Sequence, residues 1–371
     1  MAPRAWAEVD LAAVRHNVRR LRAMAAPARL CAVVKANGYG HGATAVGAAA
    51  IEAGADWLGV AQVDEVVALR NGGIEAPILV LSEPRLDEVD TAIAMGARLT
   101  VYTSACVAAV AKSVRAQRAP AVPLHLKVDT GMHRVGAAPA EVVPLAKAIG
   151  DLAEVELEGV CTHCPVADEP GNPFTQQQIA RFEAVLAELR ASGIDPGIVH
   201  AANSAAALVV PGARYDLVRC GIAVYGIPPA PALAGVVDLE PALTLASEVS
   251  FVKDVAAGEG VSYGHRQRTG AATVVATVPI GYADGVFRAL PLLGQHVLIG
   301  GVRRPMVGVV TMDQLMVDCG PDADVAAGDP VVLLGAQGDE RITPDEWAAR
   351  LGTISYEVVC AIGARVARRY R

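Results

Sequence analysis

The sequence predicts an α/β protein with an N-terminal (β/α)8 barrel of the TIM type, followed by a C-terminal, mostly β domain. Short apolar runs alternate with alanine-rich segments of helical spacing over the first two thirds of the chain. These runs number about eight, which is the number of parallel strands that closes such a barrel. No G-x-G-x-x-G follows the first strand, so an open, doubly wound sheet is the less favoured alternative.

The predicted strands are continuously apolar, as expected when helices cover the outside of a parallel sheet. They comprise residues 31–36, 57–61, 77–82, 99–103, 124–129, 155–163, 198–204 and 217–226. The intervening segments have helical spacing, and several end in glycine, the usual residue after a helix C-terminus. The helices are expected at residues 43–54, 64–73, 86–96, 104–117, 141–150 and 175–193.

A proline-rich passage at residues 228–243 predicts a linker between two domains. We therefore expect a barrel domain at 1–238 and a C-terminal β domain at 239–371. The second domain has β-type runs separated by turn glycines, and one clear helix that begins after Thr343 with Pro344 in its first position. The run "YEVVC" near the C-terminus also has the pattern of a strand.

The composition excludes several functional classes. The 371-residue chain is 53% hydrophobic and has a formal net charge of −7, which argues against a nucleic-acid or anionic-membrane surface. No apolar run reaches the roughly 18 to 20 residues that span a bilayer, and the first residues do not form a signal peptide. Seven cysteines, an odd number scattered through apolar runs, are typical of reduced thiols. We expect a cytoplasmic protein that acts on a small molecule.

The barrel prediction indicates where the chemistry lies, because catalytic residues of such barrels follow the C-terminal ends of the strands. Lys35 ends the first strand, in "CAVVKANGYGHG". A lysine there is costly to bury unless it is paired or reacts, although its amine can also extend to solvent. Arg134 follows the fifth strand and His163 ends the sixth. The last two strand ends contribute Asn203, Ser204, Arg219, Gly221 and Ile222.

A lysine and a phosphate pocket at the same end of a barrel suggest pyridoxal 5′-phosphate (PLP) held as a Schiff base. Loops after the seventh and eighth strands commonly bind phosphate. The tight turn after Lys35 would let the Tyr39 phenol reach a phosphate oxygen. Taken alone, Asn203 and Ser204 are better explained as the cap of a helix.

The segment "AVVKANGYGHG" resembles the PLP-lysine motif of the alanine racemase family. The resemblance covers nearly the whole chain through motifs in the family's order. They are "LKVDTGMHRVG", "THCPVADEP", "HAANSAA", "RCGIAVYG", "VSYGHR", "IGYADG", "GVVTMDQLMVD" and "TISYEVVC". It implies a PLP-binding barrel, a C-terminal β domain, and a homodimer with shared active sites.

The resemblance implies that Lys35 binds the cofactor covalently and is one catalytic base, and that Tyr263, from the partner subunit, is the second. Arg219 would face the pyridine nitrogen, with His163 supporting it. The residues expected to hold the phosphate are Tyr39, Ser204, Gly221, Ile222 and Tyr356, with Asn203 nearby.

The remaining implied roles concern the substrate. Arg134 and the Met312 N–H would contact the substrate carboxylate. Tyr282 and Asp313 would line the entrance. Lys127 matches a lysine that many members carry as a carbamate, although an unmodified lysine paired with a carboxylate such as Asp129 is an open alternative.

Physical chemistry is consistent with these roles. Racemisation removes the Cα proton on one face and returns a proton on the other, which requires two bases. The guanidinium of Arg219 cannot protonate the pyridine nitrogen, which makes the cofactor a weaker electron sink and disfavours transamination. An acidic residue is expected there in related decarboxylases.

Two residues depart from the family pattern. Gly38 replaces an alanine, which is expected to loosen the turn slightly. Cys164 replaces an aromatic residue and creates "CTHC", but no second ligand pair lies at metal spacing, so we expect buried apolar thiols and no metal.

The sequence therefore predicts an isomerase that interconverts L- and D-alanine and supplies D-alanine for peptidoglycan. A racemase of broader specificity, including serine, is an alternative. A PLP-dependent decarboxylase is opposed by Arg219. A PLP carrier without turnover is opposed by the C-terminal domain and its Tyr263.

Overall fold

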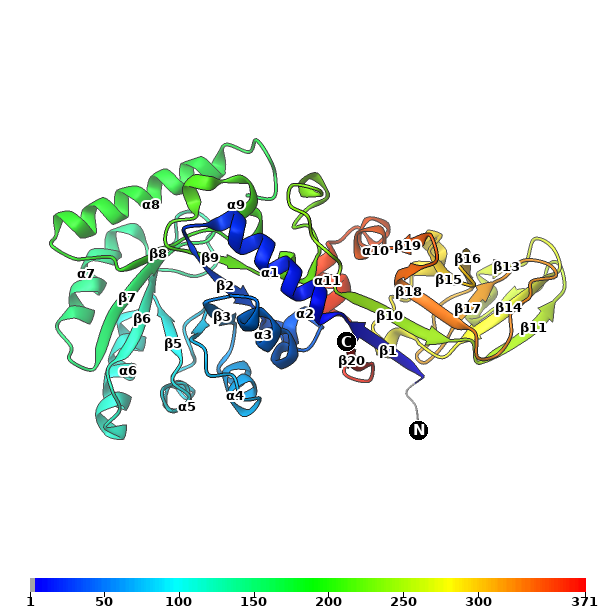
Figure 1. The fold of residues 1–371 in the computed structure, drawn as a ribbon, viewed down its shortest axis with the longest axis horizontal. Coiled ribbons are helices and arrows are strands. Elements are labelled where there is room, and N and C mark those ends of the chain that lie inside the picture. Colours follow the sequence, from blue (N-terminus) through cyan, green and yellow to red (C-terminus); the bar gives the residue numbers. More distant parts are fainter. Residues whose placement is uncertain (1–3) are drawn as a thin grey trace. The chain divides into compact units, whose positions relative to one another are not determined.

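A computed structural model describes residues 4–371, which form two compact units (Figure 1). We call residues 13–38 and 43–240 the barrel unit. We call the described residues 4–12, 39–42 and 241–371 the β unit. No helix among the described residues is long and apolar enough to cross a membrane.

Eight parallel strands form the sheet of the barrel unit. They are β2 (Arg29–Val33), β3 (Trp57–Val60), β4 (Ile78–Val80), β5 (Arg98–Val101), β6 (Val122–Lys127), β7 (Val155–Cys161), β8 (Ile198–His200) and β9 (Leu217–Cys220). The hydrogen-bonded order is β8-β7-β6-β5-β4-β3-β2-β9. Two backbone bonds join the end strands, from Arg219 N to Ala202 O at 2.9 Å and from Asp216 N to Val199 O at 3.0 Å. The sheet thus closes on itself, which confirms the predicted barrel.

Helices follow the strands in the predicted alternation (Figure 1). They are α3 (Ala43–Glu52), α4 (Val63–Asn71), α5 (Val89–Ala94), α6 (Ser104–Gln117), α7 (Pro139–Gly150), α8 (Phe174–Ala191) and α9 (Ser204–Val209). Helix α6 begins after Thr103, whose Oγ1 accepts the Cys106 N–H at 3.2 Å, a side-chain cap. The first helix, α1 (Leu11–Ala25), is not among the predicted elements, although Val14, Val18 and Leu21 are buried at helical spacing.

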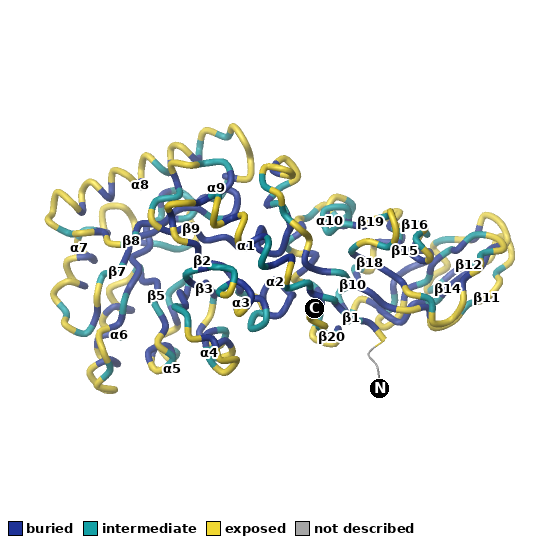
Figure 2. Tube along the Cα trace, in the orientation of Figure 1, coloured by how far each residue is buried: buried dark blue, intermediate teal, exposed yellow. Residues whose placement is uncertain are grey.

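The strands of the barrel unit consist mostly of buried residues (Figure 2). The fully buried members include Leu58, Leu79, Leu99, Leu124 and Leu126. The strands are short because they need to span only this packed interior, and the helices cover their outer faces.

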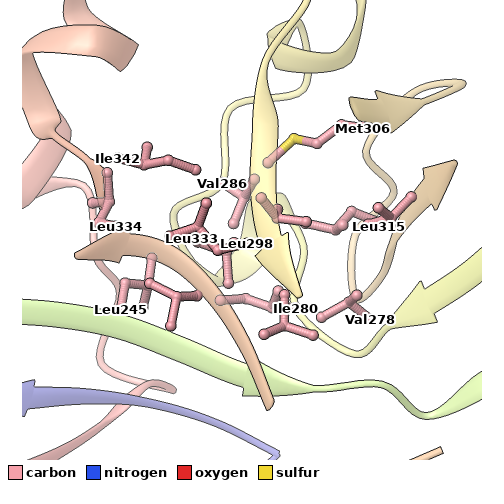
Figure 3. Close-up of a cluster of buried hydrophobic side chains, with 14 of the residues drawn as sticks. Leu245, Val278, Ile280, Val286, Leu298, Met306, Leu315, Leu333, Leu334 and Ile342 are labelled. Carbon is pink, nitrogen blue, oxygen red and sulfur yellow. The ribbon is translucent and has the colours of Figure 1, made fainter. Parts of the chain in front are cut away.

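The β unit is built on a ten-stranded sheet in the order β11-β14-β17-β16-β15-β18-β10-β1-β20, with β19 paired to β18. Its strands are β1 (Ala5–Val9), β10 (Leu243–Glu248), β11 (Phe251–Val255), β14 (Thr273–Val278), β15 (His296–Ile299), β16 (Val302–Val307), β17 (Leu315–Asp318), β18 (Pro330–Gln337), β19 (Glu340–Ile342) and β20 (Ala367–Tyr370). Strands β12 (Gly260–Val261) and β13 (Gln267–Arg268) form a separate hairpin. Figure 3 shows the apolar core of the β unit, including Leu245, Leu298 and Leu333.

The N-terminal strand β1 belongs to this sheet and not to the barrel. It pairs antiparallel with β10, with Ala7 opposite Leu245, and parallel with β20, with Ala7 opposite Arg368. The division of the chain between residues 238 and 239 stays a prediction. A single division of that kind places β1 with the barrel, whereas both of its strand partners, β10 and β20, lie after residue 240 in the β unit.

The two sequence-based expectations for the C-terminal segments have different outcomes. Helix α10 (Pro344–Leu351) begins as predicted, and the Thr343 side chain accepts the Glu346 N–H at 3.2 Å. The strand expected at "YEVVC" is wrong, because Ser355–Cys360 forms helix α11. Ser355, Val358 and Val359 are its buried residues, at the i, i+3, i+4 spacing of a helix, and a run this short does not distinguish the two periodicities.

The close packing of the barrel unit predicts a large effect of shortening a buried leucine. Leu124→Ala on β6, at a fully buried position, is expected to lower the free energy of unfolding by about 2–5 kcal/mol, because it leaves a cavity. Urea denaturation measures this. Leu86→Ala, at a side chain that is 61% exposed, is the matched control and should change stability by less than about 0.5 kcal/mol. Equal effects of the two substitutions would contradict the packing described.

Candidate active site

Lys35 lies two residues beyond β2, at the start of an unusual turn. The next four residues, Ala36, Asn37, Gly38 and Tyr39, have φ values of 51°, 52°, 62° and 50°. Left-handed backbone costs about 1–2 kcal/mol for each residue other than glycine, so other contacts must hold this turn. At +62° Gly38 avoids that cost, so glycine eases the formation of the turn.

Hydrogen bonds to the barrel unit hold the turn. The carboxylate of Glu65, at the start of α4, accepts the Ala36 N–H at 2.5 Å and the Ala61 N–H at 2.7 Å. The Gly38 N–H donates to Val34 O at 2.8 Å. These contacts fix the backbone that carries Lys35 at the C-terminal end of the strands.

Four predicted cations surround His163. Burial keeps the pKa of His163 well below its usual range, and the positive charges of Arg219, Lys127, Arg134 and Lys35 lower it further. The structure therefore brings these five predicted residues together at one end of the barrel. Such a concentration of positive charge suits an anionic ligand.

Lys127 lies on β6 and is 7% exposed. Its amine is 3.4 Å from Leu81 O, and burial, together with the nearby cations Arg219, Arg134 and Lys35, lowers its pKa. The alternative in which Asp129 pairs with Lys127 is wrong. The Asp129 Oδ1 instead accepts three backbone N–H groups of the following turn, those of residues 131, 132 and 133, at 2.9–3.1 Å.

The loops after β8 and β9 are joined through Ser204. Its Oγ accepts the Gly221 N–H at 2.8 Å, and the side chain is buried. Asn203 caps α9, accepting the Ala206 N–H at 3.0 Å and donating to Cys164 O at 2.9 Å. Helix capping is thus the role the structure gives to Asn203.

The same two loops leave buried backbone donors without acceptors. Within residues 4–371, no acceptor contacts the N–H groups of Ser204, Ala205, Ile222 and Ala223, all of which are buried. Buried backbone N–H groups are nearly always paired in native proteins. With the Ser204 hydroxyl they form a donor set that fits a phosphate.

Arg219, on β9, is 6% exposed and tightly held. Its Nη2 donates to Thr162 O at 2.8 Å and to Ala201 O at 3.0 Å, and lies 3.2 Å from Nδ1 of His163. Its Nη1 contacts Nδ1 of His200 at 2.7 Å, a partner that the sequence did not predict. Its Nε makes no hydrogen bond within the described residues, so a fixed donor is left for a ligand acceptor such as a pyridine nitrogen.

Other predicted residues lie in the β unit. The rings of Tyr39 and Tyr356 have centroids 6.1 Å apart. Gly40 follows Tyr39, and a side chain there would collide with Val359 O. The Gly40 carbonyl accepts a bond from Arg368 Nε at 2.9 Å. These contacts explain why residues 39–42 group with the β unit.

Two loops of the β unit place Tyr282 beside Met312. The Tyr282 N–H donates to Thr311 O at 3.0 Å, and the next N–H donates to Met312 O at 3.1 Å. The Met312 N–H has no acceptor in residues 4–371. Asp313 pairs with Arg365 at 2.7 Å.

Tyr263 is 73% exposed. The preceding Ser262 has a φ of 64°, and its hydroxyl donates to Val309 O at 2.8 Å. The backbone beneath the ring is thus held while the phenol projects outward.

The two cysteines of "CTHC" are free, buried thiols. Burial raises the pKa of both Cys161 and Cys164, so both stay protonated at neutral pH. Across the described part of the chain, no group of three or more His, Cys, Asp or Glu side chains is arranged to hold a metal ion.

Comparison with known proteins identifies the family. The alanine racemase N-terminal domain model matches residues 9–229, and the alanine racemase C-terminal domain model matches residues 242–370. The chain belongs to the alanine racemase family. Members are PLP-dependent isomerases, and the donor set of the barrel unit fits that cofactor: N–H groups near Ser204 and Ile222 that could bind a phosphate, a fixed donor at Arg219, and an amine at Lys35.

Relatives and solved structures of the family match over almost the full chain. The alanine racemase of Symbiobacterium thermophilum is 53% identical over 98% of this chain and 96% of its own. That of Mycobacterium tuberculosis is 45% identical over 99% and 96%. The Bacillus anthracis enzyme, solved with bound L-Ala-P, superposes with a TM-score of 0.93 at 39% identity, covering 100% of this chain and 96% of that one. The Streptomyces lavendulae structure gives 0.93 at 41%, covering 100% and 98%.

The buried histidines predict acid sensitivity. His125, His163 and His200 have pKa values lowered chiefly by burial, so they stay neutral when folded but bind protons when unfolded below about pH 6.5. Since the unfolded state then binds more protons, the free energy of unfolding should fall as the pH decreases below 6.5, by up to about 1.4 kcal/mol per pH unit for each histidine.

Urea denaturation at pH 7.5 and pH 5.5 measures this loss. Calorimetry at pH 6 in two buffers of different ionisation enthalpy should show proton uptake on unfolding. Equal stability at the two pH values would contradict the neutral, buried state of these histidines.

Proposed function

We propose that this chain interconverts L-alanine and D-alanine by a two-base mechanism with PLP, and that it works as a homodimer. The observation that supports this best is the environment of Arg219. A buried guanidinium is held by backbone carbonyls while its Nε–H has no acceptor among the described residues, and it belongs to a cationic group that includes Lys35. Family membership supports the reaction class.

The cofactor would be held at both of its ends. Lys35 is its attachment point, and the Ser204 hydroxyl and the free N–H groups near Ser204 and Ile222 would bind its phosphate, next to Gly221 and Asn203. Tyr39 and Tyr356 would add phenol donors to that phosphate. When bound, PLP supplies an electron sink that makes the Cα proton of an amino acid removable.

Two side chains would move the proton. Lys35 would act on one face of Cα, and Tyr263 of the partner subunit on the other. Tyr263 is 73% exposed, so its phenol is accessible to a second chain.

Arg219 favours racemisation over other PLP chemistry. A guanidinium donates a hydrogen bond to the pyridine nitrogen without transferring its proton. The ring then withdraws electrons less strongly, which disfavours transamination. The same reasoning opposes a decarboxylase, for which an acidic group is expected at this position. His163 accepts one Arg219 N–H and so helps to keep the guanidinium in place.

Substrate size and charge would be set by Arg134, the free Met312 N–H, and the entrance residues Tyr282 and Asp313. The lowered pKa of Lys127 supports its conversion to a carbamate, because only a neutral amine reacts with CO₂. Alanine is the favoured substrate and serine an alternative. A PLP carrier without turnover is opposed by the C-terminal domain, which the family model matches.

The biological setting that we propose is the cytoplasm of a bacterium that makes peptidoglycan. The free thiols support a reducing compartment: all seven cysteines are unpaired, and six of them are buried.

Circular dichroism of L-alanine tests the reaction. With purified protein and PLP, the signal should decay toward zero, and Lys35→Ala should abolish the decay because it removes one base and the attachment point. Lys147→Ala, at an exposed lysine on α7, is the matched control and should leave the rate unchanged. An unchanging signal with the unsubstituted protein would reject alanine as the substrate.

Mixing two inactive variants tests the shared site. Lys35→Ala and Tyr263→Ala should each be inactive alone. After subunit exchange, half of the dimers are mixed and each has one intact site, so activity should return to about one quarter of the unsubstituted level. No recovery, with exchange verified by native mass spectrometry, would contradict the donation of Tyr263 by the partner.

A further inference from the structure

A continuous chain of polar side chains runs through the barrel interior from Arg219. Arg219 Nη1 is 2.7 Å from His200 Nδ1, and His200 Nε2 is 2.8 Å from His125 Nδ1. His125 Nε2 is 2.9 Å from Glu158 Oε2. The Nε of Arg98 lies 2.9 Å from Oε1 and 2.8 Å from Oε2 of the same carboxylate. We call these five residues the histidine–glutamate chain.

The histidine–glutamate chain crosses the barrel from one end to the other. Arg219 is near the C-terminal end of β9, where the candidate active site lies. His125 is in the middle of β6, and Arg98 is the first residue of β5. The far end is partly open to solvent, since the side chains of Arg98 and Glu158 are 25% and 18% exposed.

The residues that surround the histidine–glutamate chain accommodate its imidazole rings. His125 and His200 are fully buried. The Trp57 ring meets His125 edge-on at 5.4 Å, and the Arg98 guanidinium lies 4.7 Å from the centre of the same indole. Gly159 of β7 leaves room for the imidazole, because a Cβ there would lie 2.7 Å from His125 Nδ1. Buried polar groups of this kind are costly unless every partner is present.

Only one direction of hydrogen bonding satisfies the whole chain. Arginine is a donor only, so His200 must accept at Nδ1 and hold its proton on Nε2. His125 must then accept at Nδ1 and donate from Nε2 to the carboxylate.

The charge states agree with this direction. Burial, and then the Arg219 charge, keep the pKa of His200 well below its usual range. Burial also lowers the pKa of His125, despite its bond to Glu158. Burial alone would raise the pKa of Glu158, but the bond from His125 and the charge of Arg98 outweigh it and the pKa is lowered. Both imidazoles are therefore neutral and the carboxylate is ionised.

We propose that Glu158 is a positioning residue for the reaction: it holds His125 in the tautomer whose Nδ1 accepts from His200, and through the two imidazoles it balances the buried charge of Arg219. The reverse direction would point a His200 N–H at an Arg219 N–H, and the ionised carboxylate excludes it because it can only accept. Arg219 is thereby held with its Nε–H available to the pyridine nitrogen. This inference rests on the proposed function.

Glu158→Gln tests the proposal with little change of shape. A glutamine amide both donates and accepts, so both tautomers of His125 become available, whereas Arg219 still holds His200 with its proton on Nε2. In ¹⁵N NMR of histidine-labelled protein, the unsubstituted chain should show His125 and His200 protonated on Nε2 alone. The variant should show a mixture of Nε2–H and Nδ1–H forms at His125, and the Nε2–H form alone at His200.

Two further variants serve as controls. Glu158→Asp keeps the carboxylate and should retain the Nε2–H forms. Glu156→Gln, at an exposed glutamate of the same strand, should change nothing. An Nδ1–H on His125 or His200 of the unsubstituted chain would overturn the proposal even if Glu158→Gln does not fold, as would identical His125 tautomers in Glu158→Gln and the unsubstituted chain.

A second readout concerns the loaded enzyme. Glu158→Gln should raise the fraction of alanine turnovers that convert the cofactor to its amine form by about 10-fold, as expected for the loss of one charge-assisted hydrogen bond, with little change in KM. An unchanged fraction would overturn the positioning role. Absence of racemisation by the unsubstituted protein would instead reject the proposed function, and the tautomers would still decide whether Glu158 directs the chain.

Discussion

The burial of one guanidinium constrains much of the barrel interior. Arginine stays charged at any pH that a protein meets. Because Arg219 lies inside the barrel, neighbouring groups must accept its hydrogen bonds and offset its positive charge. Two backbone carbonyls and two imidazoles do so directly, and a carboxylate does so at the end of the histidine–glutamate chain. The neutral state of the buried histidines follows from the same charge, which adds to the effect of their burial.

This arrangement separates two tasks within one barrel. The continuous apolar runs give the closed sheet its stability, whereas a small set of inward polar residues orients Arg219. Both sets share the same strands: β6 carries the fully buried Leu124 and Leu126 with His125 between them. Since neighbouring residues of a strand point to opposite faces, one strand can pack against helices and contribute to the polar chain.

Much of the fold could be predicted from local patterns, because parallel strands and their helices repeat along the chain. Strand β1 could not, since its partners β10 and β20 lie more than two hundred residues away and no local signal identifies them. Helix α11 was mistaken for a strand because six residues are too few to separate periods of 2 and 3.6. The predicted barrel residues around His163 do converge. His125, His200 and Glu158 were not identified from the sequence. A polar residue inside an apolar run gives no indication of the partner that it contacts across the barrel.

The missing side chain of Gly159 has a consequence for how this barrel can change by mutation. Any larger residue at 159 collides with the Ile198 carbonyl and with the His125 ring. Positions 125 and 159 are therefore coupled: a substitution at either one alone interrupts the hydrogen bonds that link Arg219 to Glu158. A redesign that fills this gap must move the Ile198 carbonyl and replace the imidazole as well, which breaks the link between the guanidinium and Glu158. One absent methyl group thus restricts the sequences that this interior can accept.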